Sequence, residues 1–504
     1  MDFASSLFLV LYFAILLLLG LFGLHRYFLT YLYYRHKKNL PVAIPRFEEL
    51  KRVPRVTIQL PIYNEKYVVE RLLQKVTEID YPRDFLEIQL LDDSTDETAQ
   101  IALSLVEQYQ QKGVPIVYLH RRNRVGFKAG ALQEGLKVAK GELIAIFDAD
   151  FLPASDFLKK MVPYFFGAQH YGMVQARWGH LNQDYSLMTQ AQSVLLDGHF
   201  VIEHTARNRS GRFFNFNGTA GIWDKRCIED AGGWGFDTLT EDLDLSYRAQ
   251  LKGWKFLYVP EVVVPAELPV DMNGFKAQQH RWAKGSIQTA KKLIPTIFKS
   301  SLPLRVKLES CFHLLNNFAY VLMVVLSFLM PFAIYFRHQH GLDDYFWIDL
   351  PVFLMATVSV GTFYLCSQRE IYSDWKSRII FLPFNLAMGI GLAINNTKAV
   401  LEALSNHQSE FARTAKYAIS QKSDCWENKK YKTKFSLVTF VELFLGGYFT
   451  AALVFAVMNG LWLSLYCLIL FQVGFLYTGL LSLLQGRSYV KLAPSLETSS
   501  FSPE

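Results

Sequence analysis

The sequence predicts an integral membrane protein in which an α/β domain is inserted between membrane-spanning helices. Hydrophobic residues make up 51% of the 504 residues and include 40 Phe and 26 Tyr, more than a soluble core requires. Residues 6–23 are almost uninterruptedly apolar, close to the roughly 20 residues that cross a bilayer. Residues 51–290 instead alternate short β-branched runs with helical patterns, which is typical of a mostly parallel sheet covered on both faces.

The first span is expected to place the chain that follows it in the cytoplasm. A signal peptide would carry its basic residues before the apolar run, whereas Arg26, Arg35, Lys37 and Lys38 follow it. By the positive-inside rule the N-terminus then lies outside, in a bacterial inner membrane or its Golgi or plasma-membrane equivalent. The net charge of +7 is spread along the chain, which favours this reading over a nucleic-acid partner.

Four further spans are expected after the α/β domain, at 312–335, 346–366, 435–458 and 461–484, giving five in all. The apolar stretch 379–404 is predicted as an interfacial helix on the cytoplasmic face, because a span there would move the Lys-rich loop at 413–434 outside. The expected domains are therefore a first span with a basic linker (1–50), the α/β domain (51–290), the membrane region (291–486) and a polar tail (487–504). The five Cys residues form no CxxC pair, so neither a disulfide framework nor a zinc site is predicted.

The elements of the α/β domain are expected in strand–helix order. Strands are predicted at 55–63, 87–94, 115–121 and 142–150, and helices at 68–79, 100–111 and 131–140. In an open parallel sheet, ligands bind beyond the carboxyl ends of the strands. The residues that follow each strand are therefore the first candidates for a functional site.

Acidic residues stand at two of these strand ends. Asp148 and Asp150 follow one apolar run, and alternation points both side chains to the same side. Two close carboxylates repel unless a cation lies between them, so Mg²⁺ or Mn²⁺ shared with a diphosphate is the expected occupant. A solvated loop would explain an isolated pair equally well, but Asp92 and Asp93 end the strand at 87–94 in the same manner.

A third strand end carries Tyr63, Asn64 and Glu65, of which the Tyr ring and the Asn amide suit a nucleobase. Lys128 stands between Gly126 and Gly130 just before a helix, where an ammonium group can approach a phosphate. An ordinary surface lysine is the alternative for Lys128.

Two later motifs suit the transfer of a sugar. Thr240 can cap a helix whose first turn holds Glu241 and Asp242, and either acid could act as a general base on an attacking hydroxyl. An ordinary acidic helix start is the alternative. In "KAQQHRWAKGS" (276–286), Arg281 can neutralise a leaving diphosphate and Trp282 can hold a sugar ring, although a plain amphipathic helix would also place them so.

Together these motifs resemble the processive glycosyltransferases of family 2, the cellulose, chitin and hyaluronan synthases. The motifs of that family occur here in its order: Asp92-Asp93, Asp148-Ala149-Asp150, Thr240-Glu241-Asp242 and Gln278-Gln279-His280-Arg281-Trp282. The stretches "DDSTD", "FKAGAL", "FDADFLP", "VQARW", "FNGTAG" and "QQHRW" are most similar to the cellulose synthase-like A and C groups, which make mannan and glucan backbones. The motifs cover about residues 50–290.

The resemblance implies a GT-A glycosyltransferase fold and inversion at the anomeric carbon. It implies that Asp242, beside Glu241, is the catalytic base, and that Asp148 and Asp150 hold the divalent cation. The nucleotide sugar would be bound by Tyr63, Glu65, Asp92, Asp93, Lys128, Asp148 and Arg281. The acceptor would be bound by Asn217, Gly218, Gln278 and Trp282, with Asn217 standing where cellulose synthases carry a cysteine.

The segment 405–434 is similar to the gating loop of cellulose synthases. Phe411, Thr414 and Lys416 have the spacing of the FxVTxK motif, and Arg413 replaces its Val. A gating loop must reach the cytoplasmic active site, which agrees with an interfacial helix at 379–404. No basic motif for cyclic di-GMP is present in the C-terminal tail, so that regulation is not expected.

Three functions are compatible with these features. The first is a polysaccharide synthase that elongates a β-linked hexose chain from UDP-glucose or GDP-mannose and passes it through its own spans. The Thr240-Glu241-Asp242 triplet, shared with bacterial cellulose synthases, favours a UDP-sugar. The second is a glycosyltransferase that makes a glycosyl-diacylglycerol or polyprenyl-linked sugar. The third is a non-catalytic scaffold, which would have no use for acids at several strand ends.

Overall fold

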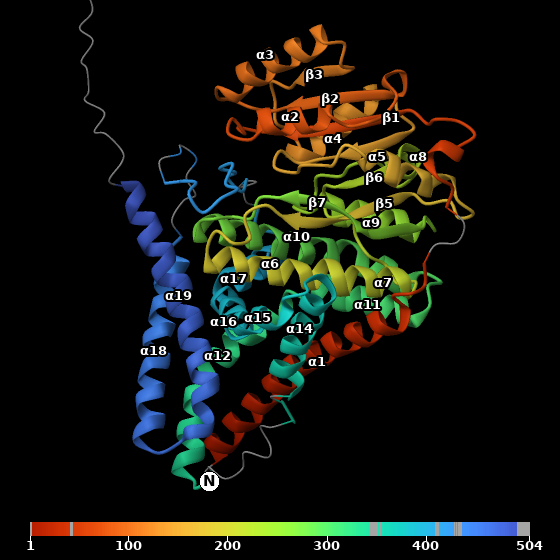
Figure 1. Cartoon of the computed structure of the whole chain (residues 1–504). Coiled ribbons are helices and arrows are strands. Elements are labelled where there is room, and N and C mark those ends of the chain that lie inside the picture. The colour runs from red at the N-terminus through yellow and green to blue at the C-terminus, as the bar shows by residue number, and fades with distance from the viewer. Residues whose placement is uncertain are drawn as a thin grey trace, which may run out of the picture.

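The structure is a computed structural model that describes residues 3–40, 44–342, 351–352, 354–408, 413–427, 429, 431 and 436–490. An α/β domain forms one end of the molecule and a bundle of long helices the other, with a layer of helices between them (Figure 1). The α/β domain is built on one sheet, as expected. The site described below lies where this domain meets the intermediate layer.

The sheet has seven strands in the order β3-β2-β1-β4-β6-β5-β7. The strands are β1 (Val56–Ile62), β2 (Leu86–Asp92), β3 (Ile116–His120), β4 (Leu143–Ile146), β5 (Met173–His180), β6 (Gly221–Asp224) and β7 (Phe256–Ala266). The first four match the expected strands and are parallel. β6 runs antiparallel to both β4 and β5, so the sheet is mixed, and β5 pairs with β7 in parallel with a register shift after Ala176.

Helices cover both faces of the sheet. One face packs against α2 (Val69–Thr77), α3 (Thr98–Gln111) and α5 (Phe157–Met161). The other packs against α4 (Phe127–Val138), α8 (Lys225–Asp230) and α9 (Glu241–Leu251). Both faces of the central strands are buried, but only β4, LIAI, is an unbroken apolar run. Polar side chains of β1 and β2 are buried as pairs: Thr57 donates to Glu87 at 2.6 Å and Gln59 donates to Gln89 at 3.0 Å.

The intermediate layer joins the sheet to the helical bundle. It contains α6 (Leu187–Asp197), a π-helical segment η4 (Gly198–His204), α7 (Thr205–Arg209), α10 (Met272–Lys299) and α11 (Leu304–Leu315). In Figure 1, α6 and α10 run below strands β5 and β7. This layer carries the 276–286 motif on α10.

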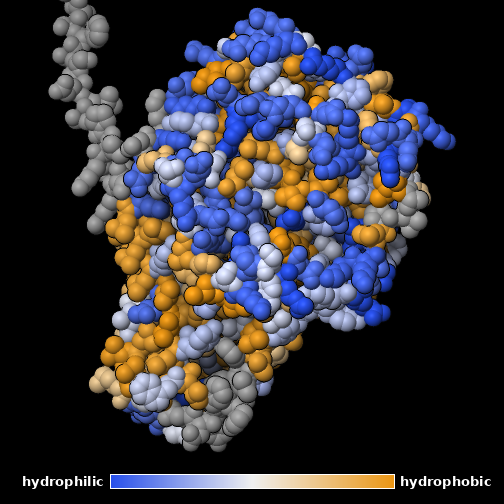
Figure 2. All heavy atoms as spheres, in the orientation of Figure 1, coloured by the Kyte–Doolittle hydropathy of each residue, from blue (hydrophilic) through white to orange (hydrophobic). Residues whose placement is uncertain are grey.

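Among the residues that the structure describes, four helices are long and apolar enough to cross a membrane: α1 (Phe3–His36), α12 (Phe318–Gln339), α18 (Val438–Met458) and the helix that includes α19 (Leu465–Val490). Hydrophobic side chains gather on the surface of this end of the molecule (Figure 2). Phe440, Phe444, Met458 and Trp462 are among the exposed hydrophobic residues of these helices and their connection. The expected span at 346–366 lies partly outside the described residues; its described part is a short π-helical turn at Leu354–Val358 and α14 (Ser359–Ile371). Helix α19 continues through Val490, into the start of the expected polar tail.

The stretch predicted as an interfacial helix is two helices with a bend. The segments Trp375–Gly391 and Ala393–Leu404 meet at 41°, a geometry that a broken span or a re-entrant loop would also have. The second of these helices, α17 (Ala393–Leu404), packs along α10 and α12.

A buried ion pair ties the intermediate layer to the C-terminal helices. Lys276 Nζ on α10 lies 2.6 Å from Glu442 Oε2 on α18, and Ser482 Oγ on α19 lies 3.1 Å from the same ammonium. Asn395 on α17 donates to the Lys276 carbonyl at 2.9 Å. The start of α10 is therefore fixed to three helices of the bundle.

Candidate active site

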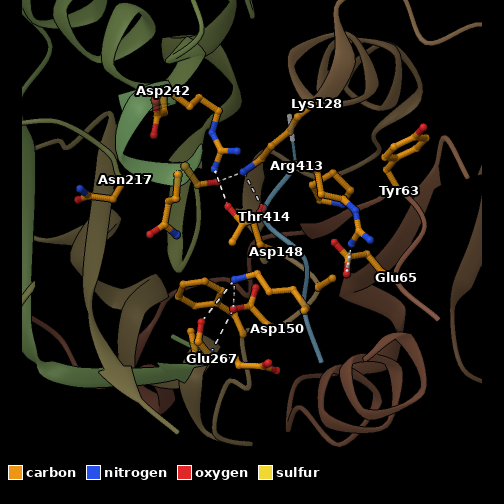
Figure 3. A pocket seen from close by; sticks show the side chains of 18 of the residues that line it. Tyr63, Glu65, Lys128, Asp148, Asp150, Asn217, Asp242, Glu267, Arg413 and Thr414 are labelled. Carbon is orange, nitrogen blue, oxygen red and sulfur yellow. Dashed lines mark hydrogen bonds and ion pairs between the residues drawn. The ribbon is translucent and has the colours of Figure 1, made fainter. Parts of the chain in front are cut away.

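A pocket opens beyond the carboxyl ends of β1 and β4, between the sheet and the intermediate layer (Figure 3). Most of the predicted residues line it, although they come from distant parts of the chain. They are Tyr63, Glu65, Asp93, Lys128, Asp148, Asp150, Asn217, Gly218, Glu241, Asp242, Gln278, Arg281, Trp282, Thr414 and Lys416. Phe411 lies outside the described residues.

Lys128 is held against the acidic groups of the pocket. Its Nζ lies 2.6 Å from Asp148 Oδ1 and donates to the Gly218 carbonyl at 2.9 Å. Burial opposes the charge on this ammonium, but Asp148, Glu241 and Asp242 together raise the pKa of Lys128 above its ordinary value. Lys128 is therefore a permanent cation among carboxylates rather than a surface lysine.

Asp242 and Glu241 begin α9 at the edge of the pocket. Burial raises the pKa of Asp242 to about 7, with Glu241 adding to the shift. Burial also raises the pKa of Glu241, against the opposing effect of Lys128. Gly218 adopts φ of 81°, and a Cβ there would lie 3.0 Å from Asp242 Oδ2. Only glycine leaves this carboxylate room beside the loop.

Thr240 occupies the residue before α9, as expected, but its side chain does not cap the helix. The Thr240 hydroxyl lies 3.4 Å from Thr289 Oγ1 on α10 instead. Gly285 of α10 packs so closely that a Cβ there would lie 2.6 Å from the Thr240 hydroxyl. The Thr240 side chain therefore packs α9 against α10 and does not cap the N-terminus of α9.

The segment at 413–417 closes one side of the pocket. Lys416 Nζ lies 2.6 Å from Asp150 Oδ2, and Arg413 Nη1 lies 2.7 Å from Glu65 Oε2 (Figure 3). Thr414 Oγ1 accepts from Arg281 Nη2 at 3.5 Å. Burial raises the pKa of Glu65 to about 7, although Arg413 opposes the shift.

Asp148 and Asp150 are the predicted ligands of Mg²⁺ or Mn²⁺. Both line the pocket, and the Asp148 side chain is 35% exposed whereas that of Asp150 is 2% exposed. No group of three or more His, Cys, Asp or Glu side chains able to hold a metal ion occurs within the described ranges. Two carboxylates nonetheless fit a hard cation that completes its shell with water and diphosphate oxygens. In this structure the Asp148 carboxylate pairs with Lys128, and the Asp150 carboxylate pairs with Lys416.

The third strand end contributes Tyr63 but not Asn64. The guanidinium carbon of Arg124 lies 3.4 Å from the centre of the Tyr63 ring, a cation–π contact at the pocket wall. Asn64 is absent from the lining, and its Oδ1 accepts from the Thr95 backbone at 2.9 Å. Its side chain links the ends of β1 and β2 instead of facing a nucleobase.

The two acids that end β2 are separated by the structure. Asp93 lines the pocket, and its carboxylate accepts two hydrogen bonds from the Arg121 guanidinium. Asp92 is fully buried and does not reach the pocket, which departs from the predicted nucleotide contact. Its carboxylate accepts from the Ser94 backbone at 2.7 Å and from the Tyr118 hydroxyl at 2.6 Å, so it holds the turn after β2.

Several lining residues were not predicted. Arg413 was predicted only as a departure from a motif, and the structure pairs it with Glu65. Glu267, after β7, accepts from the Tyr417 backbone at 2.8 Å and donates its own backbone N–H to Asp150 at 3.2 Å. Trp178 and His180, at the end of β5, also line the pocket. Trp178 belongs to the stretch "VQARW" noted in the sequence, but nothing there assigned it to the pocket.

Comparison with known proteins finds a family model and several relatives similar to parts of this chain. Residues 54–285 match the family model described as "Glycosyltransferase like family 2". The chain is 40% identical over 321 residues to glucomannan 4-beta-mannosyltransferase 1 of Oryza sativa subsp. japonica, covering 61% of each protein. It is 41% identical over 293 residues to the enzyme of the same name from Cyamopsis tetragonoloba, covering 57% of this chain and 55% of that protein. The chain thus matches just over half to three fifths of these relatives' length.

A solved structure of the mannosyltransferase PcManGT from Pyrobaculum calidifontis, in complex with GDP-Man and Mn²⁺, aligns at 21% identity with a TM-score of 0.49. The alignment covers 80% of this chain and 99% of that one. The family model itself extends from just before β1 to the middle of α10, and so includes every strand of the sheet and all the acids of the pocket. The α/β domain of this chain is therefore similar to the glycosyltransferase-like family 2 domain across its whole sheet.

Proposed function

We propose that the protein is a membrane-bound inverting hexosyltransferase that adds mannose from GDP-mannose to the end of a growing β-linked polysaccharide of mannan type. The relatives are named as mannosyltransferases, which favours mannose over the glucose that the Thr240-Glu241-Asp242 triplet suggested. The polymer would leave through the protein's own membrane helices. The donor and acceptor would meet in the pocket at the carboxyl end of the sheet.

The position of Asp242 carries this proposal. An acceptor hydroxyl must lose its proton as it attacks the anomeric carbon, and a carboxylate with a pKa of about 7 is a suitable base at neutral pH. Asp242 stands next to Gly218 at the pocket wall, with Lys128 3.3 Å from where a Gly218 Cβ would be. The Asp242 carboxylate and the Lys128 ammonium are thus close enough for both to contact one bound sugar.

The remaining lining residues divide into a donor side and an acceptor side. As the bond between the anomeric carbon and the diphosphate breaks, negative charge moves to the diphosphate, which Lys128 and Arg281 can stabilise. Asp148 and Asp150 would hold Mg²⁺ or Mn²⁺, which neutralises diphosphate charge when bound. Trp178 and Trp282 offer aromatic faces to the acceptor sugars.

The membrane arrangement belongs to the same proposal. With five spans, the N-terminus lies outside and the α/β domain lies in the cytoplasm, where nucleotide sugars are made. The bent pair α16 (Leu382–Gly391) and α17 then lies at the cytoplasmic face. The ion pair between Lys276 and Glu442 supports this placement, because it holds the motif-bearing helix α10 directly on the membrane helices.

A radiolabel assay tests the proposal. Membranes containing the full chain are incubated with labelled GDP-mannose or UDP-glucose, each with Mn²⁺ or Mg²⁺, and with the Asp242→Asn variant as control. We expect ethanol-insoluble label from GDP-mannose that β-mannanase releases. Label found only in the organic phase would instead identify a lipid glycosyltransferase, and insoluble label from UDP-glucose alone would replace mannose by glucose.

A further inference from the structure

The side chain of Asn217 is held by two histidines in one fixed orientation. His204 Nε2 lies 2.5 Å from Asn217 Oδ1, and Asn217 Nδ2 lies 3.0 Å from His199 Nε2. The Asn217 backbone N–H donates to Gln175 Oε1 at 3.1 Å. Asn217 is only partly buried and lines the pocket, as does Trp178, whose ring centre lies 4.9 Å from that of Phe200.

The hydrogen bonds around Asn217 run in one direction. The Glu203 carboxylate pairs with Arg207 at 3.0 Å and with Arg26 of α1, so it can only accept. His199 Nδ1, 3.1 Å from Glu203 Oε2, must therefore donate, which leaves Nε2 of the neutral ring as an acceptor. The Asn217 amide then donates to His199 and accepts from His204.

Both histidines are neutral, as this direction requires. Burial lowers the pKa of His199 well below its ordinary value, and His204, Arg207 and Arg26 lower it further. Burial and Arg207 lower the pKa of His204 to about 3, against a smaller opposing effect from its bond to Asn217. Neither ring gains a proton near neutral pH, so the amide does not flip.

The π-helical winding of η4 is what brings the two rings together. Residues five apart in an α-helix point about 140° away from each other. In a π-helix, whose hydrogen bonds join residues i and i+5, they lie on one side. His199 and His204 are five apart in η4, and their ring centres are 4.3 Å apart. π-Helical segments are rare and are frequently found at functional sites.

We propose that His199 and His204 are positioning residues that orient the Asn217 amide to bind the terminal sugar of the acceptor. After its two bonds to histidine, the amide still has one N–H and one lone pair of Oδ1. A pair of neighbouring sugar hydroxyls, one accepting and one donating, matches this set. The inference rests on the proposed function and assigns its acceptor-binding side.

The test measures transfer by the purified full chain with GDP-mannose and manno-oligosaccharide acceptors. His199→Leu and His204→Leu remove one bond each and should raise the acceptor KM about fivefold, which corresponds to about 1 kcal/mol, the net contribution of one hydrogen bond. The donor KM should change less than twofold. His199→Gln should restore the acceptor KM, because a Gln amide can accept from Asn217 and donate to Glu203.

His313→Leu is the matched control. His313 is also a histidine packed inside the protein, but it bonds to the Tyr247 hydroxyl at 2.8 Å and does not line the pocket. It should lower thermal stability in detergent without changing the acceptor KM. Unchanged acceptor KM values in the His199 and His204 variants, or equal changes in donor and acceptor KM, would overturn this inference and leave the proposed function standing. A wild-type protein that transfers sugar from neither GDP-mannose nor UDP-glucose would overturn the proposed function, and this inference would fall with it.

Discussion

Lys416 and Asp150 form an ion pair of 2.6 Å across 266 residues of sequence. Asp150 belongs to the strand end that was predicted to hold a divalent cation, and Lys416 belongs to the segment that closes the pocket. One carboxylate therefore faces a loop ammonium where a metal ion is expected. If Asp150 binds the proposed cation, the position of this loop and cation binding would be linked through one carboxylate.

Replacing Lys416 by Met should make cation binding easier. Without the ammonium, Asp150 has a free negative charge for Mn²⁺, so half-maximal binding of GDP should need less Mn²⁺. The measurement is a Mn²⁺ titration of GDP binding by calorimetry, with Lys422→Met, in the same loop but outside the pocket lining, as control. An unchanged or higher Mn²⁺ requirement in Lys416→Met would show that the two charges do not compete.

Asp242→Asn should abolish transfer while nucleotide still binds. A positioned general base contributes about 10²–10⁴-fold to rate, and an amide cannot accept the proton. The initial rate of mannosyl transfer and the Kd for GDP give the two readouts. Asp230→Asn, a surface carboxylate that is 49% exposed and pairs with Lys252, is the control. Near-normal turnover in Asp242→Asn would move the base to Glu241.

Activity should rise with pH up to about 7 and then level off. Burial raises the pKa of Asp242 to about 7, so the carboxyl is protonated and inactive as a base at lower pH. The pH profile of kcat/KM should therefore fall about tenfold per unit below the pKa. Glu65 also has a raised pKa of about 7, so the Glu65→Gln profile separates the two groups. A profile that loses its acid limb in Glu65→Gln would assign the titration to Glu65.

Glu442→Gln should destabilise the protein strongly. Removing one partner of a buried ion pair leaves the Lys276 ammonium uncompensated, which costs about 3–5 kcal/mol. Thermal unfolding in detergent should show a lower Tm, and the double variant Lys276→Met with Glu442→Leu should recover most of it. A Tm loss that the double variant does not recover would mean that the pair contributes through packing alone.

The strand–helix order and most pocket residues were predictable because each depends on a local pattern. A buried strand between two helical layers has an apolar run, and polar residues at its carboxyl end are visible as a break in that run. The antiparallel β6 was not predictable, since its four residues have no turn signal that sets their direction. Asp92 and Asp93 are adjacent in sequence, and only the tertiary contacts with Tyr118 and Arg121 show which one faces the pocket.

Contacts between distant segments could not be predicted from the sequence either, because they depend on the tertiary structure and not on a local pattern. Arg413 shows no periodicity that points to Glu65, and the spacing of Thr414 and Lys416 located them only through a family resemblance. The π-helical turn at 198–204 has a sequence that an ordinary helix would also accept. Its effect on His199 and His204 became visible only when their rings were found beside Asn217.

The lining of the pocket comes from residues as early as β1 and as late as the segment 413–417. During translation, that closing segment is synthesised long after every acidic motif. A chain still being translated therefore has its acids in place while one wall of the pocket is missing. Translation of α18 and α19 follows that wall and anchors α10 through Glu442. A chain that stops before residue 413 would therefore carry every acidic motif of the pocket but lack the segment that closes it.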